Sequence, residues 1–243
     1  MNVNRLTLEI TRRCNLQCRH CLRGGAQRLN MSSQVLFQVA RSISYAGDIT
    51  FTGGEPSLAV PVLEEFLQMC RWHKLQFGYF YIVTNGKTRN GWNRFLEACD
   101  GLYGWAQEPE SCVLTPSRDN FHREQHDLKL WKFMDDWSEV ERPYIKLDER
   151  TEDIRNPISE GRAANGLGWR PKEVQKPWTV SEYDGELCVS EEVLYISANG
   201  NVVSSGDISF ARIDREAKGN ILTTPLREIV ESFCIKEAEE VAA

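Results

Sequence analysis

Residues 5–21 read RLTLEITRRCNLQCRHC, a strand-like run that leads directly into three cysteines. The run from Arg5 to Thr11 alternates apolar and polar residues, which is the pattern of a β-strand with one buried face. Cys14, Cys18 and Cys21 follow on a short loop at the end of this strand. Three thiolates so placed can bind three irons of a cubane cluster and leave the fourth iron without a protein ligand. The segment therefore predicts an iron–sulfur site whose open iron can bind a cofactor or substrate.

A zinc site is the alternative for the same cysteines, with His20 as the fourth ligand. His20 is directly adjacent to Cys21, whereas structural zinc ligands usually come in two spaced pairs. No second pair of cysteines follows at the distance typical of a zinc ribbon. The spacing therefore favours iron and sulfide over zinc.

The composition predicts a soluble protein with one main core. With 243 residues, 41% of them hydrophobic, the chain can bury one large core, or one core and a small appendage. The N-terminal run MNVNRLTLEI lacks the pattern of a secretory signal, and nowhere do about 18 apolar residues run together. We therefore expect a cytoplasmic protein with no membrane partner, whose eight cysteines stay reduced.

The charge is acidic overall but basic near the cysteines. The net charge of −6 gives no general attraction to nucleic acid or anionic lipid, so no nucleic-acid partner is expected. The first thirty residues, in contrast, carry six arginines and only one acidic residue, Glu9. This region is either a solvated basic face or a docking surface for an acidic electron donor or an anionic substrate. The arginines are Arg5, Arg12, Arg13, Arg19, Arg23 and Arg28.

Strand-like and helix-like segments alternate along the first 150 residues. Strands that alternate with helices of ten or more residues predict parallel βα units, whose sites lie where strands end. About ten residues separate Asp148 from Ile158, too few for a strand, a helix and a return. The predicted fold class is therefore α/β, a partial, open parallel (β/α)5-6 barrel. Strands are expected at 5–11, 49–52, 77–84, 112–115 and 144–147, and helices at 32–45, 60–73, 88–99 and 121–140.

A small carboxyl-terminal extension is expected after the barrel. The segments 193–197 and 202–203 flank an Asn-Gly turn and predict a β-hairpin, because Asn-Gly readily adopts positive φ. A last helix is expected at 225–238. We therefore divide the chain into a barrel domain, residues 1–175, and a hairpin-plus-helix extension, residues 176–243.

Three further motifs follow the cysteines in order: Gly53-Gly54-Glu55-Pro56, Thr84-Asn85-Gly86 and Gly161-Arg162-Ala163. Together with the cysteine spacing, they resemble the signature of the radical S-adenosylmethionine superfamily. The resemblance implies one 4Fe-4S cluster, bound by Cys14, Cys18 and Cys21, whose open iron chelates S-adenosylmethionine. It implies an enzyme that reductively cleaves this cofactor to a 5′-deoxyadenosyl radical, which then abstracts hydrogen from a substrate.

The resemblance also implies roles for residues around the cluster. Gly53, Gly54 and Glu55 would hold the methionine amino group, since glycines permit close backbone approach and a carboxylate pairs with an ammonium. His20 would lie near the adenine, and a partly exposed loop histidine is the alternative. Asn85, Ser117 and Arg162 are further candidates for binding the cofactor.

Candidates for facing the substrate come from the later strands. Asp119 and His122 follow the fourth strand, and a helix cap is the alternative for Asp119. Lys146 and Asp148 leave the expected fifth strand on one face and could line the cavity. A salt bridge on the outer surface is the alternative for this pair.

The extension resembles the SPASM and twitch extensions that bind auxiliary clusters in this superfamily. Ser204-Ser205 stands where a cysteine is expected, and only Cys188 and Cys234 remain in the region. Two thiols cannot ligate a cubane in the usual four-cysteine manner, so we expect no auxiliary cluster. The remaining cysteines, Cys70, Cys99 and Cys112, are expected to be buried and inert, with a hydrogen-atom donor as the alternative for Cys112.

By analogy, the extension makes a peptide or protein the leading substrate. A small metabolite or nucleotide and the activation of a glycyl-radical enzyme are alternatives with the same chemistry. An iron–sulfur or zinc sensor, or a binding module, is the alternative without catalysis. The expected protein partner is an electron donor such as flavodoxin or ferredoxin.

Overall fold

The strand that leads into the cysteines is β1 (Asn2–Thr11), and its apolar residues Leu6, Leu8 and Ile10 are fully buried. The computed structural model describes residues 1–87, 92–125, 142–146, 157–167 and 170–237. Three further strands follow β1: β2 (Tyr45–Gly53), β3 (Gln76–Thr84) and β4 (Val113–Pro116). The helices between them are α1 (Ser33–Ser42), α2 (Val60–His73) and α3 (Trp92–Tyr103), and α4 (Asn120–Arg123) follows β4.

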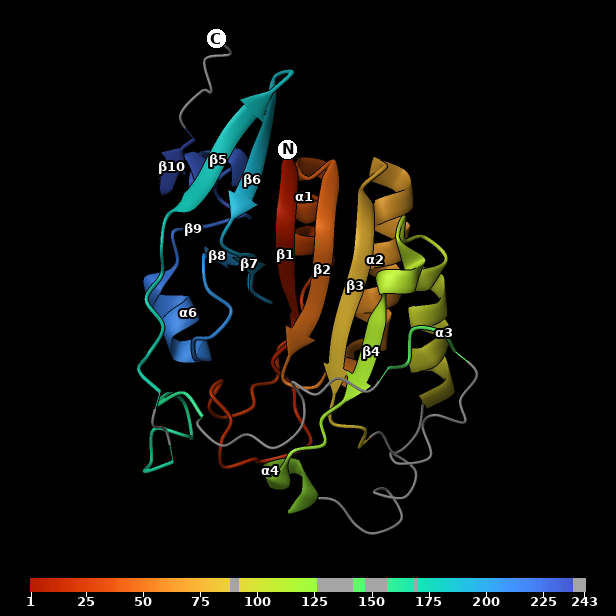
Figure 1. Cartoon of the computed structure of the whole chain (residues 1–243), viewed down its shortest axis with the longest axis vertical. Coiled ribbons are helices and arrows are strands. Elements are labelled where there is room, and N and C mark those ends of the chain that lie inside the picture. The colour runs from red at the N-terminus through yellow and green to blue at the C-terminus, as the bar shows by residue number, and fades with distance from the viewer. Residues whose placement is uncertain (88–91, 126–141, 147–156, 168–169, 238–243) are drawn as a thin grey trace.

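These four strands form a parallel sheet in the order β1-β2-β3-β4, with α1, α2 and α3 on one face (Figure 1). The core lies between sheet and helices because β1 and α1 both turn an apolar face inward. In α1 this face is built by Val35, Leu36, Val39 and Ala40, and the Ser32 side chain caps the helix by accepting from Val35 N–H. The predicted α/β fold with an open parallel sheet is confirmed.

The fifth strand expected at 144–147 is represented by one parallel bridge from Ile145 to Leu114. The Leu114 N–H donates to the Tyr144 carbonyl over 2.7 Å. Leu147, Asp148 and most of the helix expected at 121–140 lie outside the described residues. The third helix is described from Trp92 to Tyr103 and so ends later than expected, and its expected start at Thr88 lies outside the described residues.

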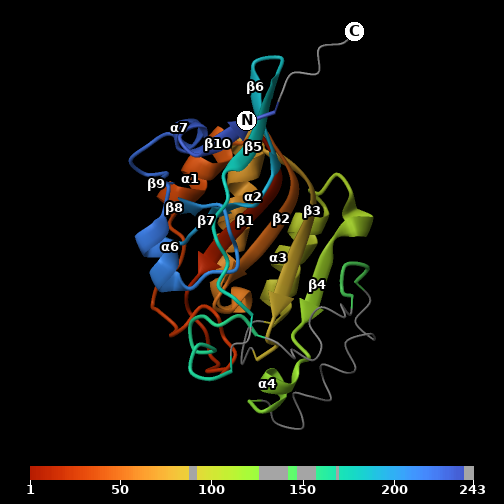
Figure 2. The ribbon, with the colours of Figure 1, turned by 60° about the vertical axis from the view of Figure 1, so that its left-hand side comes forward.

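The carboxyl-terminal residues extend the same sheet beyond β1 (Figures 1 and 2). The antiparallel strands β5 (Trp178–Tyr183) and β6 (Glu186–Glu191) are followed by β7 (Leu194–Ile196), and both β6 and β7 pair with β1 in parallel. The predicted hairpin is confirmed, since β7 pairs antiparallel with β8 (Asn201–Val203). The remaining elements are α6 (Phe210–Glu216), β9 (Gly219–Asn220), α7 (Leu226–Glu231) and β10 (Cys234–Lys236).

The prediction of one helix over 225–238 was wrong. Helix α7 ends at Glu231, and β10 pairs in parallel with β5. The aromatic ring of Phe233 meets that of Trp178 edge-on, with centroids 5.8 Å apart. Phe233 and Ile235 favour a strand, and the contact with Trp178 fixes the chain against the sheet. The division of the chain at residue 175 stays a prediction.

A buried polar network joins β1 to the extension. Glu9 is 0% exposed and accepts hydrogen bonds from Tyr195 Oη over 2.7 Å and from Arg12 Nε over 2.6 Å. The same guanidinium donates to Asp214 of α6 over 2.6 and 2.8 Å. Burial raises the pKa of Tyr195 well above its usual range, so this hydroxyl remains a donor. Among the described residues, no helix has the length and apolar composition that a membrane span requires.

Candidate functional site

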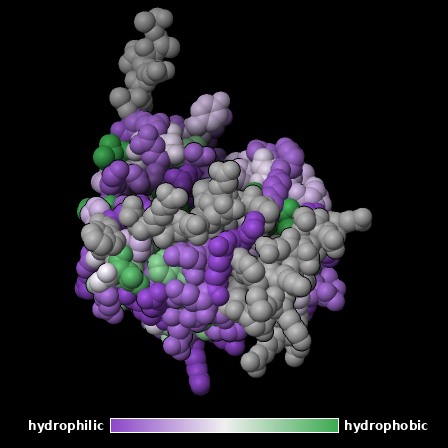
Figure 3. All heavy atoms as spheres, turned by 60° about the horizontal axis from the view of Figure 1, so that its bottom comes forward, coloured by the Kyte–Doolittle hydropathy of each residue, from purple (hydrophilic) through white to green (hydrophobic). Residues whose placement is uncertain are grey.

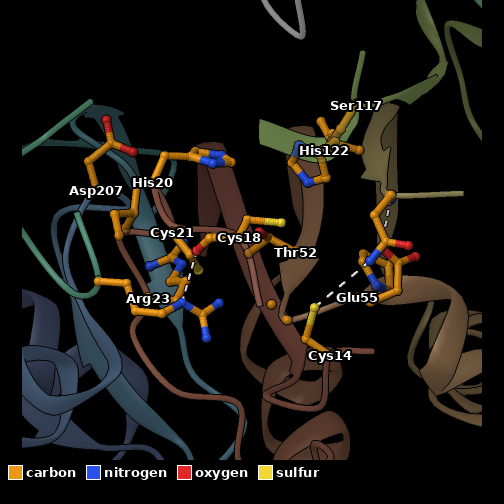
Figure 4. A pocket seen from close by; sticks show the side chains of 17 residues that line it. Cys14, Cys18, His20, Cys21, Arg23, Thr52, Glu55, Ser117, His122 and Asp207 are labelled. Carbon is orange, nitrogen blue, oxygen red and sulfur yellow. Dashed lines mark hydrogen bonds between the residues drawn. The ribbon is translucent and has the colours of Figure 1, made fainter. Parts of the chain in front are cut away.

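The three cysteines of the N-terminal loop line one cavity of about 360 Å³ at the carboxyl end of the sheet (Figure 4). Cys18 is buried, Cys14 and Cys21 are half-buried, and all three thiols are free. Burial raises the pKa of Cys14 to about 11, so this thiol stays protonated at neutral pH without a cation beside it. A metal cluster supplies the positive charge that converts such thiols to thiolate ligands. The donor set therefore fits an iron–sulfur cluster.

Gly53 and Gly54, at the end of β2, allow this strand end to approach the start of the cysteine loop closely. The N–H of Gly54 donates to the Thr11 carbonyl over 2.8 Å, and that of Glu55 donates to the Arg13 carbonyl over 2.7 Å. A methyl group at Gly53, whose φ is +147°, would lie 1.9 Å from the Thr11 oxygen. One at Gly54 would lie 2.2 Å from the Arg13 oxygen. The close approach that requires glycine here is to the chain's own backbone at Thr11 and Arg13, just before Cys14.

Glu55 connects the ends of β2 and β3 through a carboxylate that is only 1% exposed. Its Oε1 accepts from Ser57 N–H, Ser57 Oγ and Thr84 Oγ1 at 3.0, 2.6 and 2.6 Å. Its Oε2 accepts from Asn85 N–H at 2.7 Å. Since Oε1 already accepts from three donors and Oε2 from one, Oε2 is the oxygen that can accept a further hydrogen bond. Pairing of Glu55 with the methionine ammonium stays a prediction, and this oxygen is where it would occur.

Asn85 touches the cysteine loop from the end of β3. Its Nδ2 lies 3.8 Å from Cys14 Sγ and donates to Asn15 Oδ1 over 3.0 Å. Its Oδ1 accepts from Lys87 N–H, which fixes the orientation of the amide. Asn85 therefore lines the cavity as expected, in contact with the first cysteine.

Gly161 and Arg162 hold the other end of the loop. A methyl group at Gly161, whose φ is +58°, would lie 2.3 Å from the Leu22 carbonyl oxygen. The Arg162 backbone N–H donates to the Cys21 carbonyl, and its Nε donates to the Cys18 carbonyl, both over 2.9 Å. Arg162 lines the cavity, and its direct partners are the backbone carbonyls of two cysteines.

Ser117 and the short helix α4 form the side of the cavity next to β4 (Figure 4). Asp119 caps α4, since its Oδ1 accepts from Phe121 and His122 N–H over 2.9 and 3.0 Å. The cap that was the alternative for Asp119 is therefore present. Its Oδ2 lies 2.6 Å from His122 Nδ1.

The two histidines of the cavity differ in charge. His20 stacks on Phe121 with centroids 4.5 Å apart, and burial lowers the pKa of His20 to about 4, so it is neutral. Burial alone would also lower the pKa of His122, but hydrogen bonds to Asp119 and Cys18 outweigh it and raise the pKa to about 10. Ligating atoms of His20, Asp119 and His122 lie within 4.8 Å of one another. Since both Asp119 oxygens already accept hydrogen bonds, the thiols are the better metal donors.

Lys146 is not among the described residues that line the cavity, and its role toward the substrate stays a prediction. Its amine donates to the Glu110 carbonyl beside β4. Asp148 lies outside the described residues. Three polar residues of the lining were given no site role from the sequence: Thr52, Arg23 and Asp207. The alternation of β2 could have indicated Thr52, whereas Asp207 is brought here by long-range pairing of the extension, across the cavity from Ser117 (Figure 4).

The cysteines of the extension lie apart. Cys188 of β6 lies beside Ser181 of β5, and Cys234 of β10 lies beside Trp178 of β5. The two cysteines are therefore on opposite sides of β5, next to positions three residues apart along that strand. Strand spacings of ~4.8 Å and a rise of ~3.3 Å per residue separate their backbones by more than 10 Å. They therefore lie too far apart to ligate one cubane together, and the absence of an auxiliary cluster stays a prediction. Cys70, Cys99 and Cys112 are buried, as expected, and burial raises the pKa of each thiol.

Comparisons with known proteins agree with this arrangement. A family model described as a 4Fe-4S single cluster domain matches residues 5–102, and no curated protein gives a significant match. The structure of BtrN in an open conformation shares 16% identity, with 95% of this chain and 82% of that chain covered and a TM-score of 0.51. The chain also resembles anSMEcpe with bound AdoMet and Cp18Cys peptide (14% identity, 99% and 85% covered, TM-score 0.48). A third similar structure is Streptococcus suis SuiB bound to precursor peptide SuiA. It shares 13% identity, with 93% of this chain and 64% of that chain covered and a TM-score of 0.43.

At such identities the likeness to solved structures concerns the fold. The family match covers the cysteine loop and the motifs after β2 and β3, where the cavity lies. Residues 5–102 are therefore similar to a 4Fe-4S single cluster domain, and the fold of the chain is similar to that of BtrN.

Proposed function

We propose that Cys14, Cys18 and Cys21 hold the 4Fe-4S cluster and that the adjoining cavity binds S-adenosylmethionine. The observation that carries this proposal is the convergence of three free thiols and the predicted cofactor residues on one cavity. When bound, the cluster supplies one electron that cleaves S-adenosylmethionine to methionine and a 5′-deoxyadenosyl radical, which abstracts hydrogen from the substrate. The chain's own residues bind and orient the reactants.

The cavity offers different chemistry to the two ends of S-adenosylmethionine. Glu55 Oε2 and the backbone beside Gly54 lie near Cys14 and suit the methionine ammonium. Neutral His20, already stacked on Phe121, offers an aromatic surface to the adenine. Ser117 provides a hydroxyl on the wall beside β4. These observations support the proposed roles of His20, Glu55 and Ser117.

An experiment on cluster and cofactor chemistry tests this assignment. After anaerobic reconstitution with iron and sulfide, we expect about four irons per chain and, with dithionite and S-adenosylmethionine, formation of 5′-deoxyadenosine detected by mass spectrometry. Cys18→Ala should lose both, because two thiols cannot retain the cubane. Cys188→Ala is the matched control, a half-buried thiol outside the cavity, and should lose neither. A full, active cluster in Cys18→Ala would refute the assignment.

The substrate that we propose first is a peptide or protein. The support is the resemblance of the extension to SPASM and twitch segments, together with the position of Asp207 from that extension in the cavity lining. Arg23 lies on the same side and donates to the Ile208 carbonyl over 2.8 Å, which connects the cysteine loop to this part of the extension.

A small polar metabolite is the second candidate, favoured by a second cavity of about 270 Å³ that shares Asp207 with the first. Its lining carries both signs of charge, with Arg5 and Lys176 as well as Glu173 and Glu192. Stimulation of 5′-deoxyadenosine formation by pooled synthetic peptides, but not by pooled amino acids and sugars, would support the peptide. The reverse result would support the metabolite.

The enzyme also needs a reductant, and we propose that an acidic flavodoxin or ferredoxin docks beside the cysteine loop. Arg12 is buried, but Arg13, Arg19 and Arg28 are exposed. Figure 3 shows the molecule from the end where β1–β4 terminate, and much of the surface visible there is hydrophilic. Electrostatic docking of this kind weakens steeply with salt. Reduction of the cluster by flavodoxin should therefore slow as ionic strength rises, and more so in wild type than in Arg13→Ser.

A further inference from the structure

The second cavity, of about 270 Å³, lies at a break in the pairing of β1. Strand β6 pairs with β1 up to Val3, and β7 takes over at Leu6. The lining includes Arg5, from the position between these two partners, and Glu192, which follows β6. Asp207 lines both this cavity and the cluster cavity. A ligand in the second cavity would therefore lie next to the first.

Two hydroxyls of this lining are buried and, among the described residues, have no hydrogen-bond partner. Thr7 is 8% exposed and Ser204 is 1% exposed. Because Leu6 and Leu8 pack in the core against the helices, Thr7 points to the opposite face of the sheet, where the cavity lies. The Ser204 backbone N–H donates to Gln175 Oε1 over 3.1 Å, but the Ser204 Oγ is unpaired. Buried polar groups without a partner are uncommon, so these two favour a polar ligand.

Most charges of the lining have a neighbour of opposite sign. The Lys176 Nζ lies 3.6 Å from Glu192 Oε1. Arg5 is aligned with Asp48 in the parallel ladder of β1 and β2, so both side chains leave the sheet on the same face. These four residues therefore compensate one another in pairs.

Two carboxylates of the lining remain uncompensated. Within the part of the chain that the structure describes, the side chains of Glu173 and Asp207 make no ion pair and no hydrogen bond. An ionised carboxylate only accepts hydrogen bonds, and the hydroxyls of Thr7 and Ser204 can accept as well. A ligand group that carries positive charge together with several N–H donors would satisfy this set. Alkylammonium and guanidinium groups have both properties.

We propose that the second cavity is a substrate subsite in which Glu173 and Asp207 bind an alkylammonium or guanidinium group. The bound group anchors the substrate so that a neighbouring carbon reaches the cluster cavity. The inference rests on the proposed function of the cluster cavity. Figure 4 shows Asp207 on the same side of that cavity as His20, so the anchored substrate would enter from this side. The cation belongs either to a lysine or arginine side chain of a peptide or to a small amine.

The first test is direct binding of two small cations to the reconstituted holoenzyme. The probes are n-pentylammonium and n-propylguanidinium, and binding is followed by saturation-transfer NMR of the probe. Pentanol has a similar chain without the charge, and pentanoate carries the opposite charge. We expect at least one cation to bind saturably and neither control to do so. Failure of both cations to bind, or equally tight binding of pentanoate, would overturn the proposal.

Variants of the lining locate the bound cation. Glu173→Gln and Asp207→Asn should each weaken its binding about threefold, as expected for partly exposed charges, and the double variant about tenfold. Thr7→Val keeps the shape of the side chain, removes the hydroxyl and should also weaken binding. Asp184→Asn makes the same change of charge in the exposed turn between β5 and β6 and should have no effect. Wild-type affinity in the double variant would refute the subsite.

Stimulation of 5′-deoxyadenosine formation identifies the source of the cation. The comparison uses pooled peptides with lysine or arginine, the same peptides with glutamine in their place, and pooled small amines. Stimulation by the first pool alone assigns the cation to a peptide, and stimulation by the amines alone assigns it to a metabolite. Equal stimulation by the glutamine peptides would overturn the cationic anchor.

The outcomes also separate this inference from the proposed function. If reconstituted wild type holds no cluster or forms no 5′-deoxyadenosine, the proposed function fails. If it forms 5′-deoxyadenosine but binds neither cation, only the subsite is refuted.

Discussion

Replacing Arg12 by methionine should be among the most destabilising single changes in this chain. Arg12 is 1% exposed and contacts Glu9, 0% exposed, over 2.6 Å, whereas its other carboxylate partner, Asp214, is 40% exposed at its side chain. Methionine can fill much of the space but leaves the Glu9 carboxylate buried without its cation. Breaking a buried ion pair in this way costs about 3–5 kcal/mol. The remaining donors to Glu9, Tyr195 Oη and the Ala198 N–H, place the expected loss near the lower value.

The assay is thermal unfolding of the reconstituted holoprotein under anaerobic conditions. For a chain of this size, about 3 kcal/mol corresponds to a Tm lower by roughly 6–12 °C. Asp214→Asn should cost less than about 1 kcal/mol, because its ion pair is half-exposed. Arg12→Met combined with Glu9→Gln should cost less than the sum of the single changes, since the unpaired charge is gone. Equal losses in Arg12→Met and Asp214→Asn, or simple additivity in the double variant, would refute the reasoning.

The site makes three further predictions. Gly53→Ala should destabilise the fold by at least about 2 kcal/mol and lower the iron content after reconstitution, because its methyl group meets the Thr11 oxygen at 1.9 Å. Gly25→Ala, whose methyl group meets nothing within 4 Å, should change unfolding by less than about 0.5 kcal/mol. Glu55→Gln should cost about 1–3 kcal/mol by urea unfolding, since an amide NH₂ would face a donor at Ser57, Thr84 or Asn85. Arg162→Met should shorten the lifetime of the cluster in air several-fold, followed by absorbance, and unchanged decay would argue against its hold on the cysteine loop.

The elements that local patterns specify were predictable from sequence. Alternation gave β1, helical spacing gave α1, and the Asn-Gly turn gave the β7–β8 hairpin. The cysteine spacing and the three glycine-containing motifs were sufficient to locate the cavity, because the carboxyl ends of parallel strands share one edge of a sheet.

What could not be predicted depends on contacts between distant segments. The pairing of β6 and β7 with β1 joins residues near both ends of the chain, and no local pattern indicates it. The same is true of Asp207 in the cavity lining. His122 was found as a polar residue after β4, but its direction follows from the cap at Asp119 and the packing of Phe121.

The position of β1 inside the sheet affects how the protein is made. One edge of β1 pairs with β2, which is synthesised soon afterward, but its other edge waits for β6 and β7, which are synthesised much later. Until then the strand that leads into the cysteines has an open, aggregation-prone edge, and Glu9 and Arg12 lack Tyr195 and Asp214. Truncation before the extension would therefore create an exposed edge rather than a smaller stable barrel. In the cell, insertion of the cluster into a finished cavity would therefore have to wait until the extension has been synthesised.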